Sequence, residues 1–220
     1  DKVNSIKIII LNKTQAILTN IENFKDNHLL ISIYSILHGR KSLVVFGGKS
    51  KKKNSSYIKG LVSEIEFNQE NTCLNSNIIQ SYNWFLFDKY RLKTIDYICF
   101  LIGKLLFLED ERSNILKYYT SLISKMNSSE AYISEFLLLE LEILKTSGYQ
   151  PDLNKNVLAK IFKELDFSNL TTNEEIIIKI ESDFEAQSQF FDFMGRIVAR
   201  VLINLNINLP FSRSEIIQKN

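Results

Sequence analysis

The hydrophobic period of the chain changes once, near residue 86, and this change constrains the fold more than any other feature. Before it, short apolar runs with partial alternation predict strands. These are expected over residues 16–24, 28–37, 41–48 and 60–68, with a further candidate over 77–85. The links are short and rich in Asn, Asp, Gly and Ser, which favours antiparallel neighbours. About five strands in about 70 residues, closed on themselves, predict a small β-barrel.

After residue 86 the apolar residues recur at helical spacing. Helices are expected over residues 90–108, 113–126, 129–146, 158–165 and 181–203. The third should begin with a Ser129 cap and end at Gly148, because glycine commonly follows the last helical residue. The sequence therefore predicts an α+β protein with two domains. A β-barrel domain is expected over residues 1–85 and an all-helical domain over residues 86–220.

Positive charge is concentrated in the predicted barrel, although the formal net charge is only +2. Residues 1–83 hold 11 Lys/Arg against 6 Asp/Glu, whereas residues 84–220 hold 16 against 19. The two cysteines, Cys73 and Cys99, are too far apart for a CxxC pair and do not form a disulfide framework. Both are expected to be buried thiols in a reducing compartment. The apolar runs are too short to cross a bilayer, and no signal-peptide pattern is present.

The cations gather in residues 38–60, a stretch with seven Lys/Arg and no Asp/Glu. They are Arg40, Lys41, Lys49, Lys51, Lys52, Lys53 and Lys59. An apolar run at 43–46 predicts a strand that leads into a flexible Gly-Ser-Lys loop over 47–53. Lysines on such a loop suit a polyanion, because neutralising phosphates releases condensed counterions. A charge run flanked by Gly and Ser also suits a solvated loop tip.

Three aromatic residues lie on or beside the adjacent predicted strands: Tyr34, Phe46 and Tyr57. Their rings are candidates for stacking on unpaired bases. The combination of a cationic loop with nearby aromatic rings favours a nucleic-acid surface on the predicted barrel.

Signatures of catalysis are missing from the sequence. The only histidines, His28 and His38, have no Cys or His at ligand spacing, and no common catalytic motif occurs. We therefore expect that the chain is not an enzyme and that it holds no metal or cofactor. Three carboxylates of the third predicted helix do not converge and are expected to face solvent or to pair with Lys145. These are Glu135, Glu140 and Glu142.

The last predicted helix carries Arg196 and Arg200 four residues apart, hence on one face. Such a pair suits either a partner's carboxylate or an extended DNA path. Arg213, which follows Pro210, is a similar candidate. A solvated helix face explains the same pattern.

Three passages follow one another in an order that resembles one protein family. The first is His38-Gly39-Arg40 followed by Gly47-Gly48-Lys49-Ser50, the second is LELEILKTSGYQPDL over residues 139–153, and the third is NLPFSR over residues 208–213. Together they resemble the bacterial DNA repair protein RecO, over about residues 15–216, so that residues 1–14 form an extension. Many members carry a cysteine zinc site that begins where Asn156 stands here. Without those ligands the chain resembles the zinc-free members.

The resemblance implies an oligonucleotide-binding (OB) barrel followed by a helical domain. It also implies a recombination mediator in the cytoplasm, at the nucleoid, that binds single- and double-stranded DNA and anneals complementary strands. The implied protein partners are the C-terminal tail of single-stranded-DNA-binding protein and RecR, with which the family helps to load RecA. A carboxylate of that tail is expected on Arg196, Arg200 or Arg213.

Other classes of function fit the residues too. An OB-fold RNA-binding or ribosome-associated factor would have the same basic barrel. A protein scaffold would use the basic loop only for solubility. A hydrolase is the weakest alternative, because no catalytic group is visible in the sequence.

Overall fold

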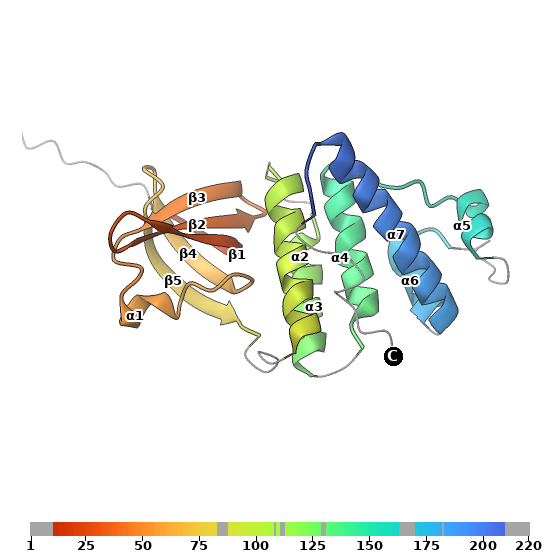
Figure 1. Cartoon of the computed structure of the whole chain (residues 1–220), viewed down its shortest axis with the longest axis horizontal. Coiled ribbons are helices and arrows are strands. Elements are labelled where there is room, and N and C mark those ends of the chain that lie inside the picture. Colours follow the sequence, from red (N-terminus) through yellow and green to blue (C-terminus); the bar gives the residue numbers. More distant parts are fainter. Residues whose placement is uncertain are drawn as a thin grey trace, which may run out of the picture.

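The computed structural model describes residues 11–82, 88–107, 109–110, 113–128, 131–162, 170–181 and 183–209. Within these ranges a five-stranded antiparallel sheet is followed by helices, which confirms the predicted α+β class. The sheet occupies one end of an elongated molecule and the long helices occupy the other (Figure 1).

The sheet has the spatial order β3-β2-β1-β4-β5. Its strands are β1 (Leu11–Phe24), β2 (His28–Ser35), β3 (Gly39–Val45), β4 (Val62–Asn68) and β5 (Cys73–Gln80). The two edge strands approach each other where Val44 and Thr72 form a single parallel bridge. A five-stranded sheet that stays partly open in this way is an arrangement that an OB-type barrel allows.

Strand boundaries differ from the prediction at three places. Strand β1 begins at Leu11, so residues 11–14 belong to the sheet and not to an extension. Strand β3 ends at Val45, and the predicted flexible loop contains a helical turn, α1 (Lys51–Asn54). Strand β5 begins earlier than predicted, and residues 83–85 of the predicted strand lie outside the described residues.

Six helices follow the sheet in the described part of the chain. They are α2 (Lys89–Leu105), α3 (Ile115–Asn127), α4 (Ile133–Thr146), α5 (Lys155–Ile161), α6 (Asn173–Glu181) and α7 (Phe184–Asn204). The prediction missed α6, whose apolar run is short. Gly148 follows the end of α4 with a φ of +81°, and Tyr149 N donates to Leu144 O at 2.7 Å, which confirms the predicted cap. The predicted Ser129 cap lies outside the described residues.

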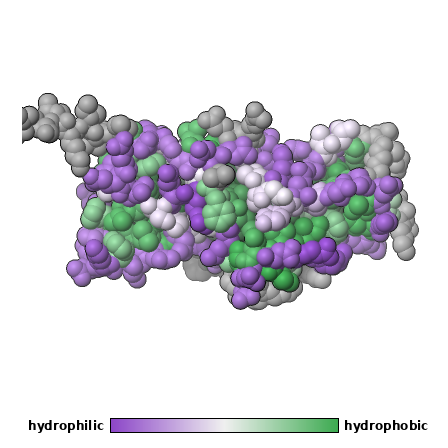
Figure 2. All heavy atoms as spheres, turned by 90° about the horizontal axis from the view of Figure 1, so that it is seen from above, coloured by the Kyte–Doolittle hydropathy of each residue, from purple (hydrophilic) through white to green (hydrophobic). Residues whose placement is uncertain are grey.

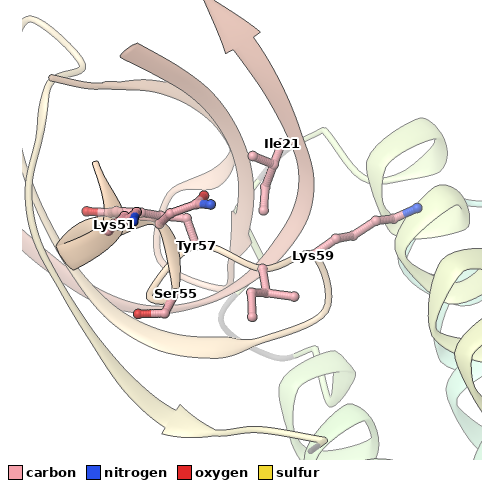
Figure 3. A pocket seen from close by; sticks show the side chains of 7 residues that line it. Ile21, Lys51, Ser55, Tyr57 and Lys59 are labelled. Carbon is pink, nitrogen blue, oxygen red and sulfur yellow. The ribbon is translucent and has the colours of Figure 1, made fainter. Parts of the chain in front are cut away.

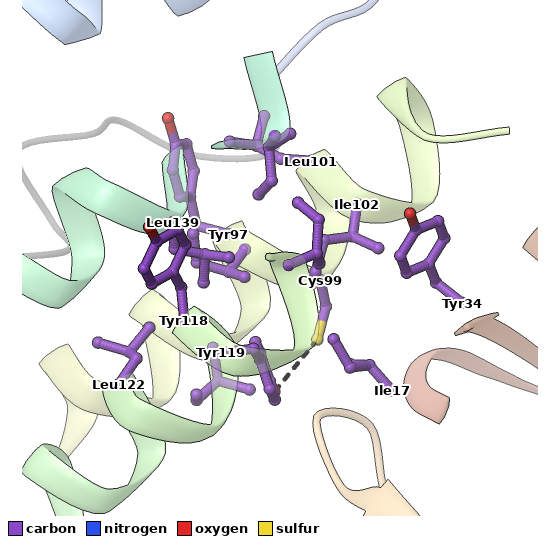
Figure 4. Packing of buried hydrophobic residues seen from close by; sticks show 14 of the residues in the cluster. Ile17, Tyr34, Tyr97, Cys99, Leu101, Ile102, Tyr118, Tyr119, Leu122 and Leu139 are labelled. Carbon is purple, nitrogen blue, oxygen red and sulfur yellow. Dashed lines mark hydrogen bonds between the residues drawn. The ribbon is translucent and has the colours of Figure 1, made fainter. Parts of the chain in front are cut away.

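Helix α2 joins the sheet to the other helices, because it packs on β1 and β2 on one side and on α4 on the other. Figure 4 shows this shared core, in which Ile17 and Tyr34 of the sheet lie beside Cys99 and Ile102 of α2. Both cysteines are buried free thiols, as predicted. Burial raises the pKa of the Cys99 thiol to about 12. The sheet and the helices therefore share one continuous hydrophobic core.

Two carboxylates of α4, Glu140 and Glu142, are buried, which corrects the first of the two predicted alternatives, that they face solvent. Glu140 accepts a hydrogen bond from the Tyr97 hydroxyl. Glu142 accepts from Asn114 N at 2.9 Å and pairs with Lys145 at 3.3 Å, the partner that the sequence predicted. Helix α4 packs against α2, α3, α6 and α7, so little of its surface is left for solvent. Hydrogen bonds offset the cost of burying these polar groups.

The face of the molecule seen in Figure 2 is mostly hydrophilic, with apolar side chains gathered over part of the sheet and over the middle of the helices. In the part of the chain that the structure describes, no helix is long and apolar enough to cross a membrane.

Gly60 is expected to tolerate no side chain. Its φ is +87°, and an added Cβ would lie 2.4 Å from Cγ2 of Ile95 on α2. Gly60→Ala should therefore lower the free energy of unfolding by roughly 2–4 kcal/mol, through both backbone strain and overpacking. Gly47→Ala is the matched control, because Gly47 has a φ of +65° but no atom within 4 Å of the added Cβ. Urea unfolding of both variants checks this; equal destabilisation of the two would contradict it.

Candidate nucleic-acid interface

Two of the predicted cations are held by backbone carbonyls. Lys49 Nζ donates to the carbonyl oxygens of Lys25 and Asp26, both at 3.0 Å, and so fastens the β1–β2 turn. Lys53 Nζ donates to the carbonyl oxygen of Phe46 at 3.1 Å, after the end of β3. Both side chains donate to neutral acceptors and not to carboxylates. They contribute positive potential to this end of the sheet while also holding the local fold together.

Two other cations reach toward α2. The Arg40 guanidinium donates to the Gly103 carbonyl and lies over the Phe107 ring, 4.2 Å from its centroid. Lys59 pairs with Asp96 of α2 at 2.8 Å, and both side chains are partly exposed. These two contacts place cations from the sheet beside a helix at the boundary between the two parts of the molecule.

The remaining three cations, Lys41, Lys51 and Lys52, have no protein partner within the described ranges. Lys51 and Lys52 are exposed on α1, which carries no acidic residue in its first turn. Because no carboxylate neutralises them, these lysines are the strongest candidates for contacts with phosphate groups.

Of the three aromatic residues predicted to stack on bases, two are buried and one is exposed. Tyr34 and Tyr57 are only 1% and 7% exposed, so neither ring is open to a base, and the prediction was wrong for both. Tyr34 packs under α2, and the Tyr57 hydroxyl contacts Cys73 Sγ at 3.7 Å. Burial raises the pKa of both phenols. Phe46 is 54% exposed and remains a candidate.

Each of the two histidines packs against an aromatic ring. His28 Nδ1 accepts from the backbone N of Gly47 at 3.1 Å, and its ring meets Phe46 edge-on at 4.9 Å. His38 lies edge-on to Phe67 at 5.3 Å. Among the described residues, no group of three His, Cys, Asp or Glu side chains is placed to hold a metal ion.

An open groove of about 590 Å³ lies between β1 and α1 (Figure 3). We call it the α1 groove, and its lining residues are Ile21, Lys51, Asn54, Ser55, Tyr57, Ile58 and Lys59. Ile21 and Ile58 give it an apolar part, while Lys51 and Lys59 supply charge. Figure 3 shows Lys59 extending from this groove toward the helices. The sequence did not reveal Ile21 or Ile58, because the folded chain brings β1 alongside the segment that follows α1.

A smaller hollow of about 360 Å³ lies between the sheet and α2. We call it the junction hollow, and it is lined by Thr19, Asn20, Glu22, Ser32, Arg40, Ser42, Lys59, Cys99, Phe100, Gly103 and Lys104. Lys59 lines both the α1 groove and the junction hollow, so the two adjoin at this side chain. The sequence revealed Arg40 and Lys59 but not the residues of α2.

The arginines proposed for a protein partner lie elsewhere. Arg196 and Arg200 are both exposed on α7, four residues apart. Ile203, further along α7, is 71% exposed. Arg213 lies outside the described residues. Helix α7 belongs to the helical end of the molecule, so the structure does not bring these arginines together with the cations of the sheet (Figure 1).

Fold and surface together define a class: an α+β protein whose partly open, basic five-stranded sheet precedes a group of helices. Among known proteins, the chain is similar to two curated ones named DNA repair protein RecO. It is 25% identical over 146 residues to that of Rickettsia canadensis (strain McKiel), covering 64% of this chain and 60% of the relative. It is 21% identical over 160 residues to that of Rickettsia typhi (strain ATCC VR-144 / Wilmington), covering 70% and 67%. The chain is thus a RecO-like protein.

No family model matches the chain. The aligned part spans about 60% of the length of the Rickettsia canadensis relative.

Asp96→Asn should increase affinity for a polyanion, because it releases Lys59 where the two hollows meet. The increase should be at most about fivefold, since an exposed ion pair contributes about 0.2–1 kcal/mol. Fluorescence anisotropy of a labelled single-stranded oligonucleotide measures it. Glu22→Gln removes the same charge from the junction hollow, where Glu22 bonds to Asn20 and not to a cation. The expectation is contradicted if Glu22→Gln raises the affinity as much as Asp96→Asn does. It is also contradicted if Asp96→Asn raises the affinity by the same factor when Lys59 is replaced by Ala.

Proposed function

We propose that the chain binds DNA through the basic surface of its sheet and acts in DNA repair and recombination. The observation that carries this proposal is the α1 groove, where Lys51, which has no protein partner among the described residues, lies beside an exposed apolar surface. The exposed Lys52 follows it on α1. The names of the two relatives support the repair role. The proposed role requires binding and no catalytic step. A cytoplasmic location at the nucleoid is part of the same proposal.

Binding in this proposal depends on phosphate contacts. Lys41, Lys51 and Lys52 would neutralise phosphates and release counterions, which gives affinity without sequence preference. The exposed ring of Phe46 would offer a stacking face to an unpaired base. Strand annealing then follows from electrostatics alone, because a cationic surface that screens two strands lowers the repulsion between them.

The helical end is proposed to bind protein partners. Arg196 and Arg200 would hold a carboxylate, and the exposed Ile203 would contact an apolar side chain next to it. This combination suits the acidic, apolar-ended tail of single-stranded-DNA-binding protein. Cooperation with RecR in loading RecA completes the proposed role, by resemblance to the RecO family.

A salt titration tests the DNA surface. Anisotropy of a labelled single-stranded oligonucleotide should show affinity that falls steeply as the salt concentration rises. The double variant Lys51→Ala/Lys52→Ala should bind more weakly, with a logarithmic salt slope shallower by about 0.7 for each phosphate that is no longer neutralised. The control Lys117→Ala/Lys160→Ala removes the same charge from exposed positions of α3 and α5 and should leave the slope unchanged.

Other outcomes would redirect the proposal. Absence of binding at moderate salt would favour a protein scaffold. Stronger binding to a matched RNA oligomer would favour an RNA-binding factor. Equal slopes for the α1 variant and the wild type would move the DNA surface away from α1.

A further inference from the structure

We propose that the junction hollow is a nucleotide subsite, which takes a single unpaired nucleotide from the bound strand. This inference rests on the proposed DNA binding and extends it. It assigns a role to the surface between the sheet and α2, and it gives the chain a preference for single strands over duplex.

The walls of the junction hollow are held in place by close packing. Helix α2 passes over β1 at Gly103, where an added Cβ would lie in ordinary van der Waals contact with Cβ of Thr19, at 3.7 Å. One turn earlier, Cys99 Sγ donates to the carbonyl oxygen of Leu18 at 3.8 Å. Helix α2 is thus fixed across the strand, and the hollow lies alongside this contact.

The floor of the hollow consists of small polar side chains in one row. Asn20, Ser32 and Ser42 are direct neighbours across β1, β2 and β3. The Asn20 amide donates to Glu22 at 2.7 Å, while the hydroxyls of Ser32 and Ser42 have no protein partner among the described residues. The edge of a nucleobase carries both donors and acceptors, which neutral amide and hydroxyl groups can match.

An aromatic residue and three cations complete the hollow. Phe100 is half-buried in its wall and offers a stacking surface for a base. Arg40 is already oriented by Gly103 and Phe107, and its side-chain hydrogen bond to the Gly103 carbonyl uses one of its five N–H donors. Lys104 is exposed and has no partner among the described residues, and Lys59 stands where the α1 groove begins. The cations would hold the phosphates that flank the base.

The size of the hollow favours binding of single strands over duplex. At about 360 Å³ it lies at the lower end of small-ligand sites and suits one nucleotide. A paired base could enter only after leaving its duplex, which costs a few kcal/mol. A single strand has no pairing to lose. The subsite should therefore strengthen binding to single strands and add little to the binding of duplex.

Removal of bases from the ligand provides the test. Anisotropy is measured with a labelled single strand, with an abasic strand of equal length and charge, and with the matched duplex. The wild type should bind the base-bearing strand about fivefold or more tightly than the abasic one, as expected for stacking of one base. Ser42→Val, which fills the hollow, and Phe100→Leu, which removes the ring, should reduce this preference. Their salt slopes and duplex affinities should equal those of the wild type.

Controls separate this inference from the proposed DNA binding. Gln15→Val adds the same side chain at an exposed position of β1 outside both hollows and should behave as wild type. Thermal melting identifies any variant that fails to fold, in which case the other variant decides. If the wild type binds the base-bearing and abasic strands equally, or both variants keep the preference, the subsite is overturned while DNA binding stands. If the wild type binds no oligonucleotide, both are overturned.

Discussion

The packing of α2 across β1 is the contact on which the rest of the structure depends. Helix α2 passes Thr19 of β1 at Gly103, and the Tyr119 hydroxyl of α3 donates to the Gly60 carbonyl at 2.7 Å. These contacts join the sheet to the helices through one core. A partly open five-stranded sheet leaves apolar surface that must be covered, and α2 covers it. The junction hollow exists because this cover is incomplete.

The class of fold was predictable from the sequence because it depends on hydrophobic period, which each segment carries by itself. The change near residue 86 separated sheet from helices, and the Gly148 cap followed from a local backbone requirement. The predicted boundary of a strand was wrong where contacts with a distant part of the chain extend that strand. Strand β1 begins at Leu11 because it pairs with the end of β4, and no residue near Leu11 signals that partner.

The candidate site was less predictable, since the state of a side chain depends on distant residues. Within residues 38–60 the sequence has seven Lys/Arg and no Asp/Glu, so it gives no reason to rank one of these cations above another as a phosphate contact. In the fold, Lys59 meets Asp96 and Lys49 meets the β1–β2 turn, whereas Lys51 and Lys52 meet no partner among the described residues. The prediction that aromatic rings stack on bases was wrong for two residues for the same reason. Tyr34 would be open on a free sheet, but the packing of α2 buries it. Periodicity along one strand cannot show which face another element will cover.

The proposed DNA surface and the proposed site for a protein partner lie on different parts of the molecule. Four cations, Arg40, Lys51, Lys59 and Lys104, line the two adjoining hollows, while Arg196 and Arg200 lie on α7. Since α7 contacts α4 and α4 contacts α2, the two regions are linked through packed helices but share no side chain. A ligand in the hollows would therefore leave α7 accessible. A protein that brings a DNA strand to a partner needs this separation, because competition for one surface would release the strand on contact.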